Sequence, residues 1–299
     1  MLFLWIGLGL AAFLLAFGFL LAFYSLHISR QTLAQARAWQ ENHYSLDFYD
    51  RLEKQEYTVA SYDGYLLHVQ KIVNPAAKDK YVILSHGYTD NRFGALKYAK
   101  LYLDLGFHVL VYDLRGHGEN KKAFCTYSVR ESRDLDALVR DTRSRFPDAR
   151  VVGIHGESLG AATTAASLAF APPVDFAVAD CGFSEIGSVM RAGLAKLHLP
   201  GCLLSFAAVF QKLLCGRSCS EMRPVDALKD TKTPILFLHG AQDDFILPSH
   251  SEVMYRTAKG PKALHFIEGA GHASSVLTAP QAYAGYVKEF LESLGFLSV

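Results

Sequence analysis

Two hydrophobicity patterns divide the chain. Residues 2–24 are apolar and contain no charged side chain. Beyond residue 56, short apolar runs alternate with longer segments in which apolar residues recur every three to four positions. Short apolar runs are typical of buried strands, and the longer spacing is typical of helices. The alternation predicts an α/β domain whose mainly parallel, eight-stranded sheet is covered by helices on both faces.

The expected elements follow from these runs. We expect strands near 56–61, 66–73, 81–86, 108–113, 150–155, 174–180, 234–239 and 263–268, and helices near 92–105, 130–146, 159–170, 249–258 and 280–294. Asp63-Gly64, between the first two strands, is a two-residue hairpin signal, so this pair is expected to be antiparallel.

The N-terminal run is long enough to cross a bilayer, for which about 20 apolar residues suffice. Cleaved signal peptides usually carry a basic segment and a shorter apolar core, whereas no Lys or Arg precedes this run. We therefore expect a single-pass transmembrane anchor over residues 1–28, a juxtamembrane helical connector over 29–55, and one globular domain over 56–299.

The charges that flank the anchor indicate its orientation. Arg30 and Arg37 follow the apolar run, so the positive-inside rule places the globular domain in the cytoplasm. The five cysteines, an odd number, do not suggest a disulfide framework. A net charge of +1 without a basic block gives no indication of nucleic-acid binding.

The candidate chemistry begins at Gly156-Glu157-Ser158-Leu159-Gly160, which an apolar strand precedes and a small-residue helix follows. This context is typical of a nucleophile elbow, in which a strained turn exposes a serine hydroxyl. A Cβ at Gly156 or Gly160 would crowd such a turn. Ser158 is therefore the candidate nucleophile.

A serine hydroxyl needs a base, and the base needs an orienting acid. His272 ends a glycine-rich loop after the last predicted strand, and is the candidate base. Asp243 stands three residues after Gly240, at the end of the preceding strand, and is preferred as the acid over its neighbour Asp244. The backbone amides of Leu159 and Tyr88 are the candidate oxyanion donors.

These motifs resemble those of the α/β-hydrolase superfamily, and within it small esterase and lysophospholipase-like hydrolases, the group that also contains serine aminopeptidases. The matching pieces are His86-Gly87-Tyr88, Tyr112-Asp113-Leu114-Arg115-Gly116-His117-Gly118, Gly156-Glu157-Ser158-Leu159-Gly160, Gly240-Ala241-Gln242-Asp243 and Gly271-His272. Asn120 departs from the serine usual in this group, in a loop whose role there is mostly structural. In the same loops Arg115 and the histidines next to motif glycines are expected to brace the structure.

The resemblance implies a serine hydrolase that cleaves a carboxylic ester, acyl or lipid-like, through an acyl-enzyme and without cofactor or metal. A serine peptidase or a thioesterase would use the same residues. A catalytically silent scaffold is a further alternative.

The apolar segment 184–229 interrupts the strand–helix alternation and is broken at Pro200-Gly201. Its position is where such hydrolases insert a short helical lid, and an apolar lid favours an acyl or aryl substrate. Its leucines would otherwise simply pack on the domain. The segment also holds His198, Cys202, Cys215 and Cys219, which are of types that bind zinc, although buried cysteines are the simpler interpretation.

Overall fold

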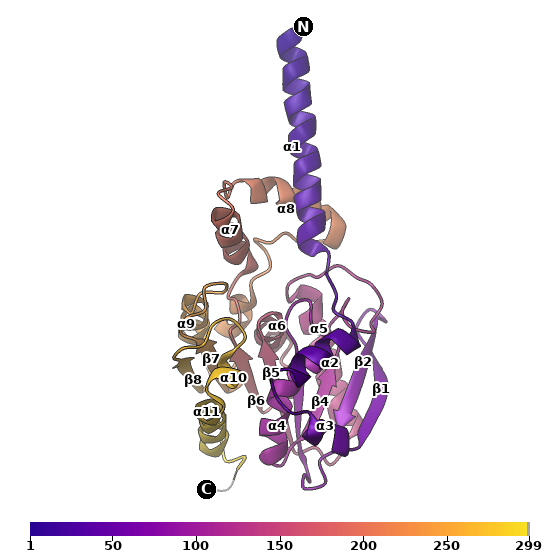
Figure 1. Cartoon of the computed structure of the whole chain (residues 1–299), viewed down its shortest axis with the longest axis vertical. Coiled ribbons are helices and arrows are strands. Elements are labelled where there is room, and N and C mark those ends of the chain that lie inside the picture. Colours follow the sequence, from indigo (N-terminus) through magenta and orange to yellow (C-terminus); the bar gives the residue numbers. More distant parts are fainter. Residues whose placement is uncertain (298–299) are drawn as a thin grey trace.

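The structure, a computed structural model, describes residues 1–297 and contains one eight-stranded sheet (Figure 1). Its spatial order is β1-β2-β4-β3-β5-β6-β7-β8. The β1–β2 and β2–β4 pairs are antiparallel, and the other neighbours are parallel. The strands are β1 (Lys54–Ala60), β2 (Leu66–Ile72), β3 (Lys80–Ser85), β4 (His108–Tyr112), β5 (Val151–Glu157), β6 (Phe176–Asp180), β7 (Ile235–Gly240) and β8 (Lys262–Ile267). The predicted α/β fold is confirmed.

Helices cover both faces of the sheet and bury two separate apolar clusters against it. One face carries α5 (Val129–Arg145), α6 (Leu159–Ser167), η2 (Leu168–Phe170), η3 (Pro224–Lys229) and α9 (Ser249–Thr257). The other carries α3 (Asp47–Arg51), η1 (Arg92–Ala95), α4 (Leu96–Asp104), α10 (Ser275–Thr278) and α11 (Pro280–Ser293). The central strands β3 to β7 are therefore almost entirely buried, as parallel strands usually are, whereas the edge strands β1 and β8 are partly exposed.

The first hairpin differs in detail from its prediction. The two strands are antiparallel as expected, but the amide of Ser61 donates to the carbonyl of Tyr65, so three residues rather than two form the loop. Gly64 is the last of the three, with φ of +80°. A left-handed glycine at this place is typical of the three-residue hairpin loop with a bulge, which the Asp-Gly pair also fits.

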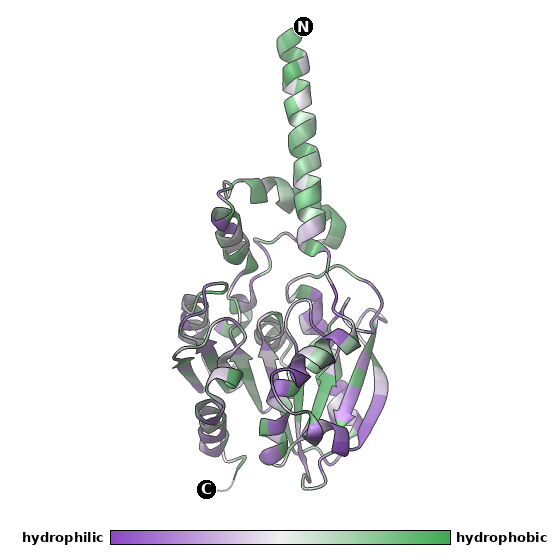
Figure 2. Ribbon diagram, viewed as in Figure 1, coloured by the Kyte–Doolittle hydropathy of each residue, from purple (hydrophilic) through white to green (hydrophobic). Residues whose placement is uncertain are grey.

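The N-terminal segment forms α1 (Leu2–Leu26), most of which projects away from the domain as an apolar rod (Figures 1 and 2). Its last turn belongs to the fold: Leu26 is fully buried, and its carbonyl accepts a hydrogen bond from the amide of Cys125 at 2.9 Å. Ile28, just beyond the helix, is also in the core. By length and composition α1 is able to cross a membrane.

The segment 184–229 contains α7 (Ile186–Lys196) and α8 (Leu203–Cys215), separated near Pro200-Gly201 as the sequence suggests. Helix α8 packs against α1 rather than against the sheet. The rings of Phe19 and Phe210 meet edge to face at 5.8 Å, and the side-chain amide of Gln211 donates to Ser25. Between α1 and β1, the residues expected to form a helical connector contain α2 (Leu33–Glu41) and α3.

A buried ionic network holds the loop after β4 in place. The Arg115 guanidinium donates to both oxygens of Asp134 on α5, at 2.8 and 2.6 Å, and to Asp63 in the first hairpin. Arg115 and Asp134 are both buried. The bracing role expected for Arg115 is therefore borne out, as is the structural role of the loop around Asn120, whose side chain bonds to His68 and to the carbonyl of Asp113.

Removing this cation should destabilise the domain. Arg115→Gln leaves the Asp134 carboxylate buried without its counter-ion, and we expect the free energy of unfolding to fall by about 3 kcal/mol. Arg150→Gln is the matched control, because Arg150 is 85% exposed and lies 3.6 Å from its acidic partner. Chemical denaturation followed by circular dichroism measures both; equal effects would contradict the assigned role of the network.

Candidate active site

The turn between β5 and α6 holds Ser158 in a strained conformation, with φ of 54° and ψ of −113°. Such angles are costly for a residue with a side chain and concentrate at functional sites. The turn closes because its flanking residues are glycines. A Cβ on Gly156 would lie 2.1 Å from the carbonyl oxygen of Gly160, and a Cβ on Gly160 would lie 2.1 Å from that of Ser85.

Three side chains from separate strand ends meet at this turn. The hydroxyl of Ser158 lies 3.0 Å from Nε2 of His272, and Nδ1 of His272 lies 2.7 Å from Oδ2 of Asp243. Because a carboxylate can only accept, Nδ1 carries the imidazole proton and Nε2 is left to accept from the hydroxyl. This is the geometry needed to move a proton from serine to histidine.

Asp243 and its rival Asp244 have opposite surroundings. The side chain of Asp243 is fully buried, and its other oxygen accepts from the amides of Phe245 and Ile246, both at 2.9 Å. Asp244 is 90% exposed and is paired with Lys196 at 3.3 Å. Of the two acids, only Asp243 contacts His272 in the part of the chain described.

A second histidine also touches the Asp243 carboxylate. Nε2 of His239 lies 3.2 Å from Oδ2 and 2.8 Å from the carbonyl of Ile246, so this nitrogen carries the proton, and Nδ1 accepts from Ser251. Burial alone raises the pKa of Asp243, but hydrogen bonds from His239, His272 and the backbone outweigh it, and the pKa falls well below its usual value. Asp243 therefore stays ionised at neutral pH.

The two candidate oxyanion amides flank the serine. Leu159 is the first residue of α6, and Tyr88 lies in the loop after β3, next to Gly87. A Cβ on Gly87 would lie 3.7 Å from that of Ser158, so the two loops are in contact. Within residues 1–297, neither amide donates to a protein acceptor, which leaves both available to a ligand oxygen.

The loop that contains Tyr88 is tied to the chain just after α1. The Tyr88 hydroxyl donates to the carbonyl of His27 at 2.9 Å, and the amide of Gln31 donates to the carbonyl of Thr89 at 2.9 Å. The conformation of this loop is therefore coupled to the N-terminal segment, which no local motif in the sequence indicates.

A buried charged cluster lies beneath the serine turn and was not identified from the sequence. Glu157 forms an ion pair with Lys97 and accepts from the Tyr98 hydroxyl at 2.6 Å. Tyr98 also bonds to Asp180, whose pKa rises to about 6 because of burial and the nearby Glu157 charge. Lys97 donates to the carbonyl of Ala273 at 2.8 Å, so the cluster supports the loop that carries His272.

The other histidines beside motif glycines have the bracing role expected of them. Nε2 of His86 accepts from the amide of Leu114, and His155 lies between the hydroxyls of Tyr102 and Tyr283. Burial lowers the pKa of His86 to about 4 and that of His155 to about 3, so both are neutral at pH 7.

The cysteines do not form the arrangements considered from the sequence. All five are free, and the His198, Cys202, Cys215 and Cys219 side chains are not among the groups that converge within metal-binding reach in residues 1–297. The group that does converge is Cys181, Asp243 and His272. Burial raises the pKa of Cys181 well above its usual value, which disfavours the thiolate that a metal would require.

Two cavities border the site. One of about 420 Å³ reaches His272 and is walled by Lys97, Asp90 and, from the connector, Trp39 and His43. The other, about 450 Å³, lies between α7 and the Asp243 loop. It reaches Phe245, whose ring packs edge-on against His272 at 5.0 Å. Both cavities are large enough for part of a small organic substrate.

Sequence comparison gives the same family as the motifs. The model of the alpha/beta hydrolase family matches residues 82–285. The uncharacterised protein YqkD of Bacillus subtilis is 33% identical over 262 residues, which are 86% of each chain. The human alpha/beta hydrolase domain-containing protein 17C is 25% identical over 73% of this chain, and the match spans 60% of its own length.

Solved structures share the fold at lower identity. The esterase Pf2001 of Pyrococcus furiosus superimposes with a TM-score of 0.70 at 22% identity, over 89% of this chain and 98% of its own. The acylaminoacyl peptidase of Pyrococcus horikoshii gives 0.61 at 16% identity, over 83% of this chain and 43% of its own. The sheet order, the serine turn and the matched family model lead to one conclusion: this chain belongs to the alpha/beta hydrolase family.

Proposed function

We propose that the protein is a membrane-anchored serine hydrolase that cleaves carboxylic esters with an apolar acyl group. The observation that carries the proposal is the continuous hydrogen-bonded relay from Ser158 through His272 to Asp243. It stands at the carboxyl ends of β5, β8 and β7, where sites form in open α/β sheets.

In the first half of the reaction the Ser158 oxygen attacks the ester carbonyl carbon while Nε2 of His272 takes the hydroxyl proton. The carbonyl oxygen becomes an oxyanion, and the amides of Leu159 and Tyr88 donate to it. Asp243 stabilises the imidazolium through its bond to Nδ1. The tetrahedral intermediate collapses when His272 gives the proton to the departing alkoxide, leaving Ser158 acylated.

In the second half a water molecule takes the place of the alcohol. His272 removes one of its protons, the resulting hydroxide adds to the acyl carbon, and the same two amides again hold the oxyanion. Return of the proton to Ser158 releases the carboxylic acid and restores the starting relay. All the proton transfers use one imidazole and need no further group.

The segment 184–229 supports the preference for an apolar acyl group. We propose that it forms the lid expected from the sequence. Helix α7 reaches the acid-bearing loop, since Lys196 at its end donates to the Asp244 carbonyl at 2.7 Å. The cavity between them is lined partly by Val189, Phe245 and Leu247. The structural neighbours include an esterase and a peptidase, so the fold alone does not discriminate between ester and peptide substrates.

Retention of α1 as an anchor is supported by its last turn. Cleavage of the apolar segment at any site after Leu26 would remove a fully buried side chain and the carbonyl that bonds Cys125. A signal peptide that leaves the mature protein has no reason to contribute to its core. The remainder of α1 is almost wholly exposed and apolar, as a helix in lipid would be. We retain the cytoplasmic side for the domain.

Ser158→Ala should abolish ester hydrolysis. We expect kcat for p-nitrophenyl esters to fall by at least about 10⁴-fold, because the covalent route is lost. Labelling by a fluorophosphonate should disappear with it. Ser293→Ala, in α11, is the control and should keep full activity and labelling. Substantial turnover by folded Ser158→Ala would refute the proposed nucleophile, and aminoacyl-arylamides tested alongside the esters would reveal a peptidase.

Asp243→Asn should reduce kcat by about 10⁴-fold, because an amide at this position no longer fixes the Nδ1–H tautomer of His272. Asp244→Asn, at the exposed neighbour, should change kcat by no more than about twofold. Thermal unfolding of both variants separates lost chemistry from lost folding. A large loss in Asp244→Asn with an active Asp243→Asn would reverse the assignment.

The anchor can be tested through its apolar span. The full-length protein should stay in the membrane pellet after alkaline carbonate extraction, with residues 2–26 present by intact-mass measurement. Leu10→Arg with Leu14→Arg should release it, because each charge at mid-bilayer costs about 3 kcal/mol. Leu10→Ile with Leu14→Ile is the matched control. A mature protein that begins after residue 24 would show that the segment is a signal peptide.

A further inference from the structure

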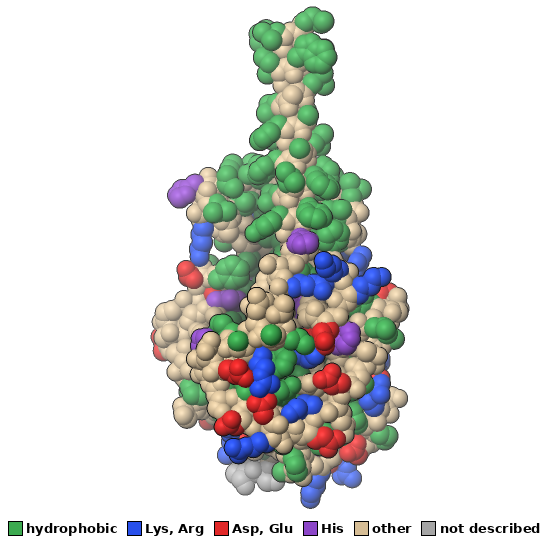
Figure 3. Space-filling view, turned by 45° about the vertical axis from the view of Figure 1, so that its right-hand side comes forward, with side chains coloured by type: hydrophobic (Ala, Val, Ile, Leu, Met, Phe, Trp, Pro, Cys, Tyr) green, Lys and Arg blue, Asp and Glu red, His purple; other side chains and the backbone are tan. Residues whose placement is uncertain are grey.

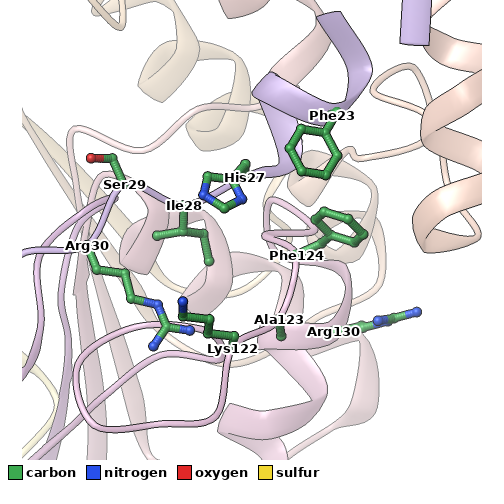
Figure 4. A pocket seen from close by; sticks show the side chains of 9 residues that line it. All are labelled: Phe23, His27, Ile28, Ser29, Arg30, Lys122, Ala123, Phe124 and Arg130. Carbon is green, nitrogen blue, oxygen red and sulfur yellow. The ribbon is translucent and has the colours of Figure 1, made fainter. Parts of the chain in front are cut away.

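A pocket of about 770 Å³ lies where α1 meets the domain (Figure 4). Phe23, His27 and Ile28 at the end of α1, together with Phe124, form its apolar side. Three cations also line it, namely Arg30, Lys122 and Arg130. In Figure 4 the charged ends of Arg30 and Lys122 lie on one side of Ala123, and Arg130 lies on the other. We call this the basic pocket.

The cations of the basic pocket have no acidic partners among residues 1–297: none has a carboxylate oxygen within 4.0 Å. Arg30 donates to the carbonyl of Asn120 at 3.0 Å, and Arg130 donates to that of Cys215 at 3.3 Å. By contrast, the buried arginines Arg92 and Arg115 are each paired with two acids. The basic pocket therefore presents uncompensated positive charge beside an apolar wall.

The position of the basic pocket along α1 sets its depth relative to a bilayer. About 20 helical residues cross the hydrocarbon core, so a span that begins at Leu2 ends near Leu21. Phe23 and His27 then lie within about two helical turns of that end, at the level of the lipid headgroups.

Helix α8 gives a second, independent indication of this depth. It packs on Gly18 and Phe19, inside the span, and leaves Phe206, Val209 and Leu213 between 38% and 76% exposed. Figure 3 shows the resulting apolar collar around the lower part of α1, with Lys and Arg side chains gathered directly beneath it. An apolar band followed by a basic band matches the order of the membrane layers, in which the hydrocarbon core is followed by anionic headgroups.

We propose that the basic pocket binds the phosphate headgroup of an anionic membrane lipid. The guanidinium of Arg30 and the ammonium of Lys122 bind the phosphate oxygens, and the Phe23 and Phe124 rings, which meet edge to face at 5.9 Å, contact the start of the acyl chains. Arg130 adds charge from the opposite side of Ala123. This inference rests on the proposed anchoring of α1, not on the chemistry at Ser158.

The test is native mass spectrometry of the full-length protein carrying Ser158→Ala, which prevents turnover of the lipid. The protein in detergent micelles is titrated with phosphatidylglycerol or with phosphatidylcholine of the same acyl chains. We expect phosphatidylglycerol to bind more tightly. Arg30→Gln with Lys122→Gln should weaken phosphatidylglycerol binding about 25-fold, because each basic residue near a lipid surface contributes about fivefold.

The matched control is Lys100→Gln with Arg150→Gln, which removes the same charge from exposed positions, 60% and 85% exposed, elsewhere on the domain. Arg30→Lys with Lys122→Arg, which keeps the charge, should retain the preference and shows that the pocket still folds. Equal weakening in the control would reduce the effect to net charge and overturn the proposal. Displacement of phosphatidylglycerol by millimolar inorganic phosphate would identify a site for free phosphate and overturn the lipid assignment.

The outcomes separate this inference from the proposed membrane anchoring of α1 and from the proposed hydrolase activity. Binding in micelles does not require α1 to cross a bilayer, so failure of carbonate resistance leaves the affinity measurement readable. Wild-type protein assayed with p-nitrophenyl esters reports on the hydrolase alone. If the protein shows no preference for phosphatidylglycerol over phosphatidylcholine while wild-type esterase activity is intact, only the lipid-binding role of the basic pocket is contradicted.

Discussion

The close approach of two backbones governs the arrangement at the centre of this molecule. The β5–α6 turn lies so near the end of β3 that a single added methyl group on Gly160 would overlap the carbonyl of Ser85. Ser158 adopts its strained conformation within this turn, and the loop after β3 lies against it. The hydroxyl and the two free amides are thus positioned by the same contact, so any change that widens it would disturb all three together.

Part of the support behind the site is electrostatic. Lys97, Glu157, Tyr98 and Asp180 form one buried network beneath the serine turn, and Lys97 extends it to the loop that carries His272. Buried ions are costly unless they are paired, and such pairs hold a narrow range of geometries. The network therefore connects both Ser158 and the loop that carries His272 to the ends of β5 and β6.

The features that the sequence predicted are local ones. Ser158 follows its apolar run directly, and Asp243 and His272 stand three and five residues beyond theirs. Strand periodicity and the glycines nearby were therefore enough to place all three at one edge of the sheet. The choice of Asp243 over Asp244 depended on spacing alone, and the structure adds the burial that distinguishes them. The hairpin loop was predicted one residue too short, because Asp-Gly fits two turn types equally well.

The features that the sequence did not predict join residues far apart in the chain. Lys97 meets Glu157 across 60 positions, and Gln211 meets Ser25 across 186. His239 looked like a loop-bracing residue, and its contact with the Asp243 carboxylate depends on how the β7 loop folds back. No periodicity records such pairings, since each depends on the packing of elements that are not neighbours in sequence.

The burial of Leu26 fixes the end of α1 to the core of the domain. A domain on a flexible linker would sample many orientations relative to its anchor. Here no linker separates α1 from the core, because its last turn is itself buried there. The chain beyond α1 is also hydrogen-bonded to the loop that contains Tyr88. With α1 in a bilayer, the domain is left to spin about the helix axis while the serine stays at constant height. If the proposed apolar ester is dissolved in that bilayer, its encounter with the serine is a search in two dimensions, in which lateral diffusion and not tumbling sets the rate.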